Sequence, residues 1–300
     1  MTNTFKTTLN VIIYICFFLN VSGMAYGENS QDISDKNAKA KRSFIQGVDG
    51  YAFLSENMTL AETREAAFAN AKRQALEMTK TFIQSKTTIE NLELVEDRID
   101  AISEGAVTVI EQKDFGIENN TRYHVWIMAE VEYGIKEHAN KDFLDYFMNE
   151  TSPLTVKVWT SKEKYSVGDS IEVYLKGNKD FFARVVGISS DGKIIQLLPN
   201  EFHQDHFFKG GHTYIIPGKN DGFKILAKPP YGADKIVVYA SEVPLGSVPM
   251  KKIDNGLHRY EGTAEALAVK TRGIKIVADD NDRKSIADFY EAACIITIEK

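Results

Sequence analysis

The sequence predicts an α+β N-terminal domain, with a helix on a small antiparallel sheet, followed by a mainly antiparallel β-sandwich domain. Three observations predict it. Many short runs alternate apolar and polar residues between turn signals, an alanine-rich helical stripe begins near residue 60, and 300 residues provide for two domains of ordinary size. Hydrophobic and charged contents of 43% and 26% are typical of a globular protein.

The strand pattern is clearest between residues 164 and 200. In Ser170–Leu175, every second side chain is apolar, as a half-buried antiparallel strand requires. Two β-rich runs, 181–188 and 193–198, are joined across Asp191-Gly192, which supplies the positive φ angles of a hairpin turn. Further strands are predicted at 213–216, 223–227 and 235–240, followed by a helix over 263–272 and closing strands at 274–278 and 292–298. Several short strands separated by turns favour a sandwich.

This segment resembles the bacterial domain of unknown function 4384 over roughly residues 154–244. The motifs that carry the resemblance are Tyr165-Ser166-Val167-Gly168-Asp169, Asp191-Gly192-Lys193, Leu197-Leu198-Pro199-Asn200, Tyr214-Ile215-Ile216-Pro217 and Tyr239-Ala240-Ser241. The resemblance implies a non-catalytic β module attached to other domains, often in envelope proteins.

The preceding domain is predicted as strand, helix, second helix and two strands. A first strand spans residues 47–54, and the capping box Thr59-Leu60-Ala61-Glu62 begins a helix that continues to about residue 84. Its apolar stripe is set by Ala67, Ala71, Ala75, Met78 and Phe82. A shorter helix is predicted within 90–103. Strands at 106–112 and 122–133 follow, joined across Asn119-Asn120.

Residues 42–136 resemble the N-terminal domain of flagellar assembly protein T and related envelope lipoproteins. The resemblance rests on Gly50-Tyr51-Ala52, Ala71-Lys72-Arg73-Gln74-Ala75-Leu76, Glu93–Ile99 and Trp126–Val131. The rest of the chain resembles the unknown-function domain instead of the flagellar protein's later domains. The resemblance alone therefore does not establish a flagellar role.

The first residues predict export. An apolar run, Leu9–Val21, is followed by the small residues of Ala25-Tyr26-Gly27, so residues 1–27 read as a cleaved Sec-type signal peptide. An uncleaved anchor is the alternative. We expect a flexible leader at 28–42, the α+β domain at 43–137, a bridging helix and linker at 138–152, and the sandwich domain at 153–300. The mature protein is expected to be periplasmic or secreted, with no integral membrane span.

Charge and cysteine content limit the classes of partner and chemistry. The formal net charge is −6, and the only basic run is Lys39–Arg42, which argues against a nucleic-acid partner. After signal cleavage Cys294 is the only cysteine, so no intramolecular disulfide forms. It lies in the apolar run 292–298, where a small buried hydrophobe is expected.

Several groups of polar or aromatic residues could support chemistry or ligand binding. His203, Asp205 and His206, with His212 nearby, could bind zinc or copper, but they lie in a loop that is expected to be solvated. His124 is predicted to be a surface or cross-strand residue. The acidic run 279–282 is predicted to be a turn that starts a helix over 282–290. Trp159, Phe181 and Phe182 could stack on sugars, but packing in the β core is the simpler expectation.

These observations predict a non-catalytic exported envelope protein that acts as a scaffold or assembly module. Its expected partners are envelope or basal-body proteins, near a flagellar basal body or the outer membrane. No catalytic, cofactor-binding or metal-binding residues are assigned. The alternative is a sandwich that binds cell-wall sugars, or a metal ion at His203, Asp205 and His206. A hydrolase is a third and weaker hypothesis.

Overall fold

The computed structural model describes residues 38–87, 107–134, 148–253, 256–272 and 286–300. The predicted signal peptide, the helix within 90–103, residues 138–147 of the bridging helix and the strand at 274–278 lie outside them. The helices are α1 (Leu60–Thr87) and α3 (Ala264–Arg272). The strands are β1 (Ala38–Phe53), β2 (Val107–Glu118), β3 (Arg122–Tyr133), β4 (Val156–Thr160), β5 (Lys164–Ser166), β6 (Ser170–Ile171), β7 (Val173–Gly177), β8 (Phe181–Ile188), β9 (Ile194–Leu198), β10 (Phe207–Phe208), β11 (Thr213–Ile216), β12 (Ile225–Leu226), β13 (Gly232–Ser241), β14 (Lys251–Lys252), β15 (His258–Tyr260) and β16 (Ile286–Glu299).

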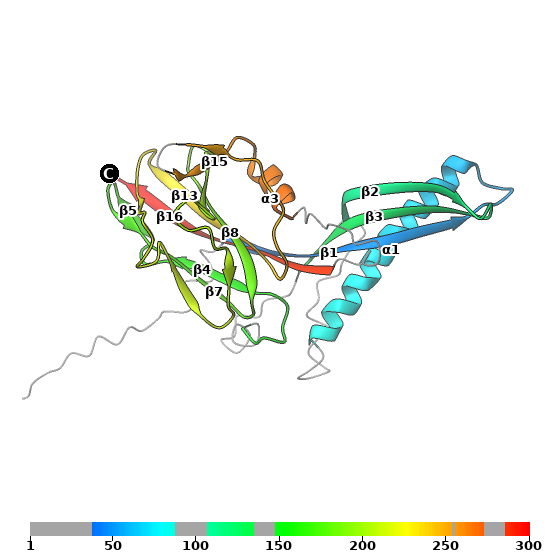
Figure 1. Cartoon of the computed structure of the whole chain (residues 1–300), viewed down its shortest axis with the longest axis horizontal. Coiled ribbons are helices and arrows are strands. Elements are labelled where there is room, and N and C mark those ends of the chain that lie inside the picture. The colour runs from blue at the N-terminus through cyan, green and yellow to red at the C-terminus, as the bar shows by residue number, and fades with distance from the viewer. Residues whose placement is uncertain (1–37, 88–106, 135–147, 254–255, 273–285) are drawn as a thin grey trace, which may run out of the picture. The chain divides into compact units, whose positions relative to one another are not determined.

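The first part of the fold is the antiparallel sheet β1-β3-β2 with α1 on one face (Figure 1). The predicted alanine stripe forms this contact, because Ala67, Ala71 and Ala75 are fully buried against the sheet. Gly50 in β1 lies under the helix, and a Cβ atom added there would come within 2.6 Å of the Cβ of Ala71. Small residues on both sides therefore let the helix backbone approach the sheet closely.

The start of α1 is held by the predicted capping box. The Thr59 amide donates to Oε2 of Glu62 at 2.7 Å, and the Glu62 amide donates to Oγ1 of Thr59 at 3.2 Å. These two bonds satisfy amides that a helix start leaves unpaired. The backbone hydrogen bond from Thr59 also lowers the pKa of Glu62.

One sheet runs through both predicted domains. Its strand order is β14-β15-β9-β8-β13-β16-β1-β3-β2, because β1 pairs with β3 on one side and with β16 on the other. Strand β1 begins at Ala38, inside the stretch predicted as a flexible leader. The domain boundaries themselves stay a prediction. The described residues show a shared sheet across the predicted boundary.

The helix predicted over 282–290 is wrong for residues 286–290, which begin strand β16. These residues pair with β1 on one side, and Phe289 and Tyr290 also pair with β13 on the other. Long-range ladders on both sides decide the conformation here, and the local acidic helix-start signal does not. The helix predicted over 263–272 is confirmed as α3, with the Ala266 amide donating to Oγ1 of Thr263 at 3.2 Å.

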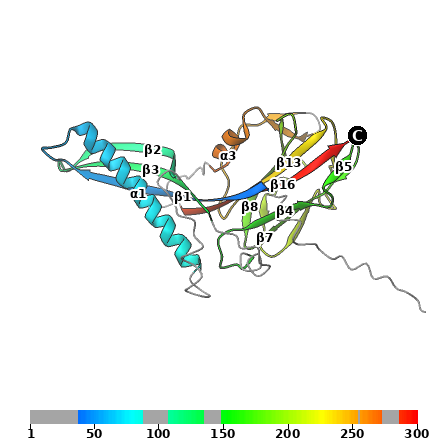
Figure 2. The same cartoon turned by 180° about the vertical axis from the view of Figure 1, so that it is seen from behind.

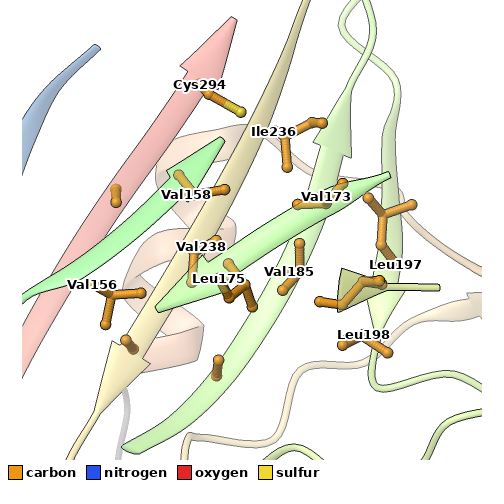
Figure 3. Close-up of a cluster of buried hydrophobic side chains, with 14 of the residues drawn as sticks. Val156, Val158, Val173, Leu175, Val185, Leu197, Leu198, Ile236, Val238 and Cys294 are labelled. Carbon is orange, nitrogen blue, oxygen red and sulfur yellow. The ribbon is translucent and has the colours of Figure 1, made fainter. Parts of the chain in front are cut away.

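The second part is a sandwich of the small sheet β11-β7-β4 on the large sheet. Figure 3 shows the interior, where Val156, Val158, Val173 and Leu175 of the small sheet face side chains of β8, β9, β13 and β16. Cys294 lies in this core, and burial raises the pKa of its thiol to about 12. The predicted hairpin is confirmed, since the Ser189 amide donates to the Lys193 carbonyl and Gly192 has φ +81°. The predicted fold class is thus confirmed.

Helix α3 covers the other face of the large sheet, as the reverse view also shows (Figure 2). Its last residue, Arg272, lies between Glu130 of β3 and Glu291 of β16, at 3.1 and 2.9 Å. The Arg272 and Glu130 side chains are only 7% and 4% exposed. Burial raises the pKa of Glu130, and Arg272 opposes this effect. No helix within the described residues is long and apolar enough to cross a membrane.

Asp288 links β16 to the first sheet and to the start of the sandwich. Its carboxylate accepts hydrogen bonds from the Leu154 amide at 2.5 Å and from the Tyr133 hydroxyl at 3.1 Å. The residue is 1% exposed, and burial raises its pKa to about 6. Arg42 of β1 and Glu242, which follows β13, have opposite and smaller effects on this pKa.

Asp288 predicts a stability that increases toward acidic pH. Its pKa is higher in the folded than in the unfolded chain, so its contribution is fully present below pH 4 and is lost as pH rises through 6. Between pH 7 and pH 4 we expect this group to add about 2 kcal/mol to the free energy of unfolding. Urea unfolding at several pH values should show a flatter profile for Asp288→Asn, whereas Asp205→Asn, in an exposed loop, should keep the wild-type profile. Parallel profiles for the wild type and Asp288→Asn would contradict it.

Candidate binding surface

Exposed apolar side chains gather where the first sheet ends. Phe53 is 73% exposed and Leu60 is 53% exposed, and four further exposed apolar residues lie in β2 or between β1 and α1. We name this set the tip surface; it consists of Phe53, Leu54, Met58, Leu60, Phe115 and Ile117. Large apolar side chains exposed in a group are typical of interaction sites.

Strand pairing brings the elements of the tip surface together. Phe53 of β1 pairs with Arg122 of β3, and Arg122 pairs with Glu118 of β2. The Leu54 amide donates to the carbonyl of Thr121, which ties the β1–α1 connection to the β2–β3 hairpin. Together with the capping box at the start of α1, these bonds fix the backbone that carries the tip surface.

A buried histidine supports the tip surface on the sheet face opposite α1. His124 of β3 has Nδ1 2.5 Å from Oε1 of Glu118 and Nε2 2.8 Å from Oδ1 of Asp49. Its ring is stacked between those of Tyr51 and Phe115, with centroid separations of 4.4 and 4.5 Å. We name these five residues the histidine clamp. It positions Phe115, which belongs to both sets.

Charged side chains around His124 stabilise the histidine clamp. The hydrogen bond from His124 lowers the pKa of Glu118, so this carboxylate stays ionised. Arg122 lies 3.0 Å from Glu118, and its guanidinium lies over the Tyr51 ring at 4.1 Å. A neutral imidazole donates through one nitrogen only, whereas an imidazolium donates to both carboxylates. Because both ring nitrogens contact carboxylates, neither is directed toward a substrate, as acid–base catalysis requires.

The clamp corrects the prediction for His124. The residue is cross-strand, as one of the two alternatives stated, but it is 3% exposed and is not a surface residue. Sequence reasoning missed Asp49 and Glu118 because they lie 75 and 6 residues away from it. The alternation in β3 places His124 on the face opposite the helix-facing residues. The available signal for its partner was Asp49 in β1, a carboxylate two residues before the aromatic Tyr51.

Replacing the clamp histidine should destabilise the first sheet. His124→Leu leaves the Asp49 and Glu118 carboxylates without a donor between them and removes the middle ring of the stack. We expect the free energy of unfolding to fall by about 2 kcal/mol. The control is His212→Leu, because His212 is exposed and its ring contacts the Gly210 carbonyl and the Tyr214 ring. Equal effects of the two substitutions in urea unfolding would contradict this role.

The structure separates the residues of the metal hypothesis. His203 pairs with Asp221, with Nδ1 3.0 Å from both carboxylate oxygens. Asp205 accepts from the Phe207 amide, and Nδ1 of His206 contacts the Gln204 carbonyl. Within the described ranges, no group of three His, Cys, Asp or Glu side chains could hold a metal ion. The acidic run 279–282 lies outside these ranges.

The three aromatic residues of the sugar hypothesis differ in their burial and in their ring contacts. Phe181 is fully buried in the sandwich core, as expected. Trp159 and Phe182 are half-buried. Phe182 contacts the rings of His206 and Phe207, whereas Trp159 is stacked with Tyr174.

Comparisons with known proteins place only the second part of the chain. No curated protein and no solved structure matches the chain. One family model, described as a domain of unknown function (DUF4384), matches residues 164–244. The match begins at β5 and ends after β13, within the region where the sequence resembles this family. The resemblance of the N-terminal half to flagellar assembly protein T stays a prediction. Residues 164–244 are therefore identified as a DUF4384 domain.

Proposed function

We propose that this chain is a non-catalytic, exported envelope protein that acts as a scaffold or assembly module. The tip surface carries this proposal. Its centre is aromatic and aliphatic, and charged residues such as Arg122 and Glu118 lie beside it, which is the composition of a protein–protein interface. The capping box of α1 and the backbone hydrogen bond between Leu54 and Thr121 hold the tip surface in place. A partner would therefore meet a preformed surface.

The reactive side chains of the described part support a binding role. Both ring nitrogens of His124 contact carboxylates, and Nδ1 of His203 is paired with Asp221. Cys294 is buried, and its raised pKa disfavours the thiolate that a nucleophile needs. Each of these groups is thus engaged in a structural contact.

Export and the setting of the partner belong to the same proposal. Residues 1–27 have the pattern of a Sec-type signal, which would deliver the chain to the periplasm or beyond. Proteins of the envelope or of a basal body are then the first partners to test, given the resemblance of residues 42–136. Intact mass measurement of the protein from its native cells should give a chain that begins after Gly27.

The alternative function is the binding of a metal ion or of cell-wall sugars by the sandwich, and the structure supports these two ligands unequally. The contacts of His203, Asp205 and His206 do not favour a metal ion. Sugar binding is favoured by one observation, the stacked pair Trp159 and Tyr174, and is developed below.

Substitutions in the tip surface test the proposed function. A photo-crosslinking side chain in place of Leu54 should capture an envelope protein that can be identified and purified. Binding of that purified partner should weaken at least about tenfold in Phe53→Ser with Leu60→Ser, because buried aromatic and aliphatic anchors dominate interfaces.

The matched control removes exposed apolar groups elsewhere. Val167 and Leu226 are 46% and 44% exposed on the sandwich, so Val167→Ser with Leu226→Ser removes exposed apolar groups without touching the tip. This variant should bind the partner as the wild type does. Equal losses in the two double variants, or an unchanged affinity of the tip variant, would refute the proposal.

A further inference from the structure

The outer face of the small sheet carries an aromatic row. The register pairs Trp159 of β4 with Tyr174 of β7, and Tyr174 with Ile215 of β11. The Trp159 and Tyr174 rings are stacked, with centroids 5.5 Å apart and planes 15° from parallel. Ile215 is 41% exposed, and both rings are half-buried although their strand neighbours point into the core. The row therefore lies on the sheet surface directed away from the sandwich interior.

The neighbouring row is basic. Lys157 of β4 pairs directly with Lys176 of β7, and Lys176 pairs with Thr213 of β11. Like charges directly opposite on neighbouring strands destabilise a sheet. Neither lysine has an acidic partner among the residues that the structure describes, although exposed lysines such as Lys164 and Lys193 do. The fold therefore leaves two adjacent positive charges uncompensated beside the aromatic row.

Glu172, which lies just before β7, contacts the aromatic row. Its carboxylate accepts a hydrogen bond from the Tyr174 hydroxyl at 2.9 Å. This bond raises the pKa of Tyr174 and keeps its hydroxyl protonated. The hydroxyl of Thr213 and the two ammonium groups remain as donors on the same face.

We propose that this face binds a carboxylate-bearing glycan, with peptidoglycan as its source. The C–H faces of sugar rings would pack against the rings of Trp159 and Tyr174. A carboxylate of the stem peptide attached to the muramic acid would lie between Lys157 and Lys176, in charge-assisted hydrogen bonds. The ligand charge would then offset the repulsion that the folded sheet contains.

The composition of this face favours a glycan over a protein. The tip surface has aliphatic groups such as Met58 and Leu60, which suit the apolar side chains of a protein partner. The small sheet instead combines aromatic rings with hydroxyl and ammonium groups. An aromatic platform with a few convergent polar groups is typical of small-molecule recognition.

Calorimetric titration of the full mature chain tests this inference. Soluble disaccharide–peptide fragments of peptidoglycan should bind, and the affinity should fall as salt is raised because salt screens exposed charges. The neutral sugar triacetylchitotriose, which lacks carboxylates, should bind at least about tenfold more weakly. Trp159→Ala, and Lys157→Gln with Lys176→Gln, should each weaken binding of the fragments by a similar factor.

The controls separate this site from misfolding and from the tip surface. Lys219→Gln removes an exposed lysine elsewhere and should leave binding unchanged. The double lysine variant should melt at or above the wild-type temperature, because it relieves like-charge repulsion. The Phe53→Ser, Leu60→Ser variant should bind the fragments normally, so this inference can fail without the proposed function failing.

Three results would overturn the inference. These are a flat titration with peptidoglycan fragments, equal affinity for fragments and triacetylchitotriose, and fragment binding that is unaffected by the Trp159 and lysine substitutions. Binding of a phosphate-bearing glycan in place of the fragments, or recognition of this face by a protein alone, would equally refute the carboxylate assignment.

Discussion

Arg272→Met is expected to lower the free energy of unfolding at pH 7 by about 3–5 kcal/mol. The guanidinium is the counter-ion of both Glu130 and Glu291, whose side chains are 4% and 13% exposed. Methionine fills a similar volume but leaves the carboxylates of Glu130 and Glu291 without the Arg272 guanidinium. Removal of one partner from a buried ion pair is far more costly than its replacement as a whole.

Chemical denaturation with pH as a variable gives the sharpest measurement. The loss should shrink as the pH is lowered, because burial raises the pKa of Glu130 and this group becomes neutral more readily than an ordinary glutamate. Adding Glu130→Gln to Arg272→Met should recover part of the lost stability. Arg259→Met is the control, since Arg259 and its partner Glu261 are 37% and 55% exposed, and it should cost less than about 1 kcal/mol. A loss below that value for Arg272→Met would mean that the ion pairs do not hold α3 on the sheet.

Gly50→Ala should destabilise the chain by about 3 kcal/mol, since no space exists for one additional methyl group. The new Cβ would collide with the carbonyl oxygen of Ala67 and would lie 3.0 Å from the amide nitrogen of Ala71. Both are backbone atoms of α1, so no side-chain rotation relieves the contact. The whole helix would have to move away from the sheet.

Gly187→Ala provides a matched control in another strand. A Cβ atom there would meet only Cδ1 of Leu197, at 3.9 Å, which is ordinary contact. Alanine also loses less conformational freedom on folding than glycine, so this variant should be as stable as the wild type or slightly more stable. Thermal unfolding of the two variants side by side measures the difference. Similar melting temperatures would show that α1 is not closely packed on β1.

The sequence predicted the elements whose signals are local. Alternation gave β3 with its observed bounds, and the capping box and alanine stripe gave the start and the buried face of α1. It did not predict that β1 extends back to Ala38, or that residues 286–290 form a strand. Both features depend on the β1–β16 ladder, whose partners are far apart in the chain. Local patterns carry no information about such a pairing.

In the candidate surfaces, too, local signals were readable from the sequence and contacts made by strand pairing were not. Trp159 was recognised as an aromatic that could stack on sugars, but its side of the sheet follows from the pairing of β4 with β7 and not from its own neighbours. The clamp around His124 required Asp49 and Glu118 from two other strands. Side chains that become neighbours only through strand pairing were therefore the part that sequence reasoning missed.

The ladder between β1 and β16 also has a consequence for the order of assembly. A chain that emerges amino end first completes β1, α1, β2 and β3 while one edge of β1 still lacks its partner, because Gln46 pairs with Ile286. Until the last segment arrives, that edge presents unpaired amides and carbonyls to any neighbouring chain. Docking of β16 between β1 and β13 is thus the closing event, and a nascent or truncated product without it would be the form most prone to aggregate.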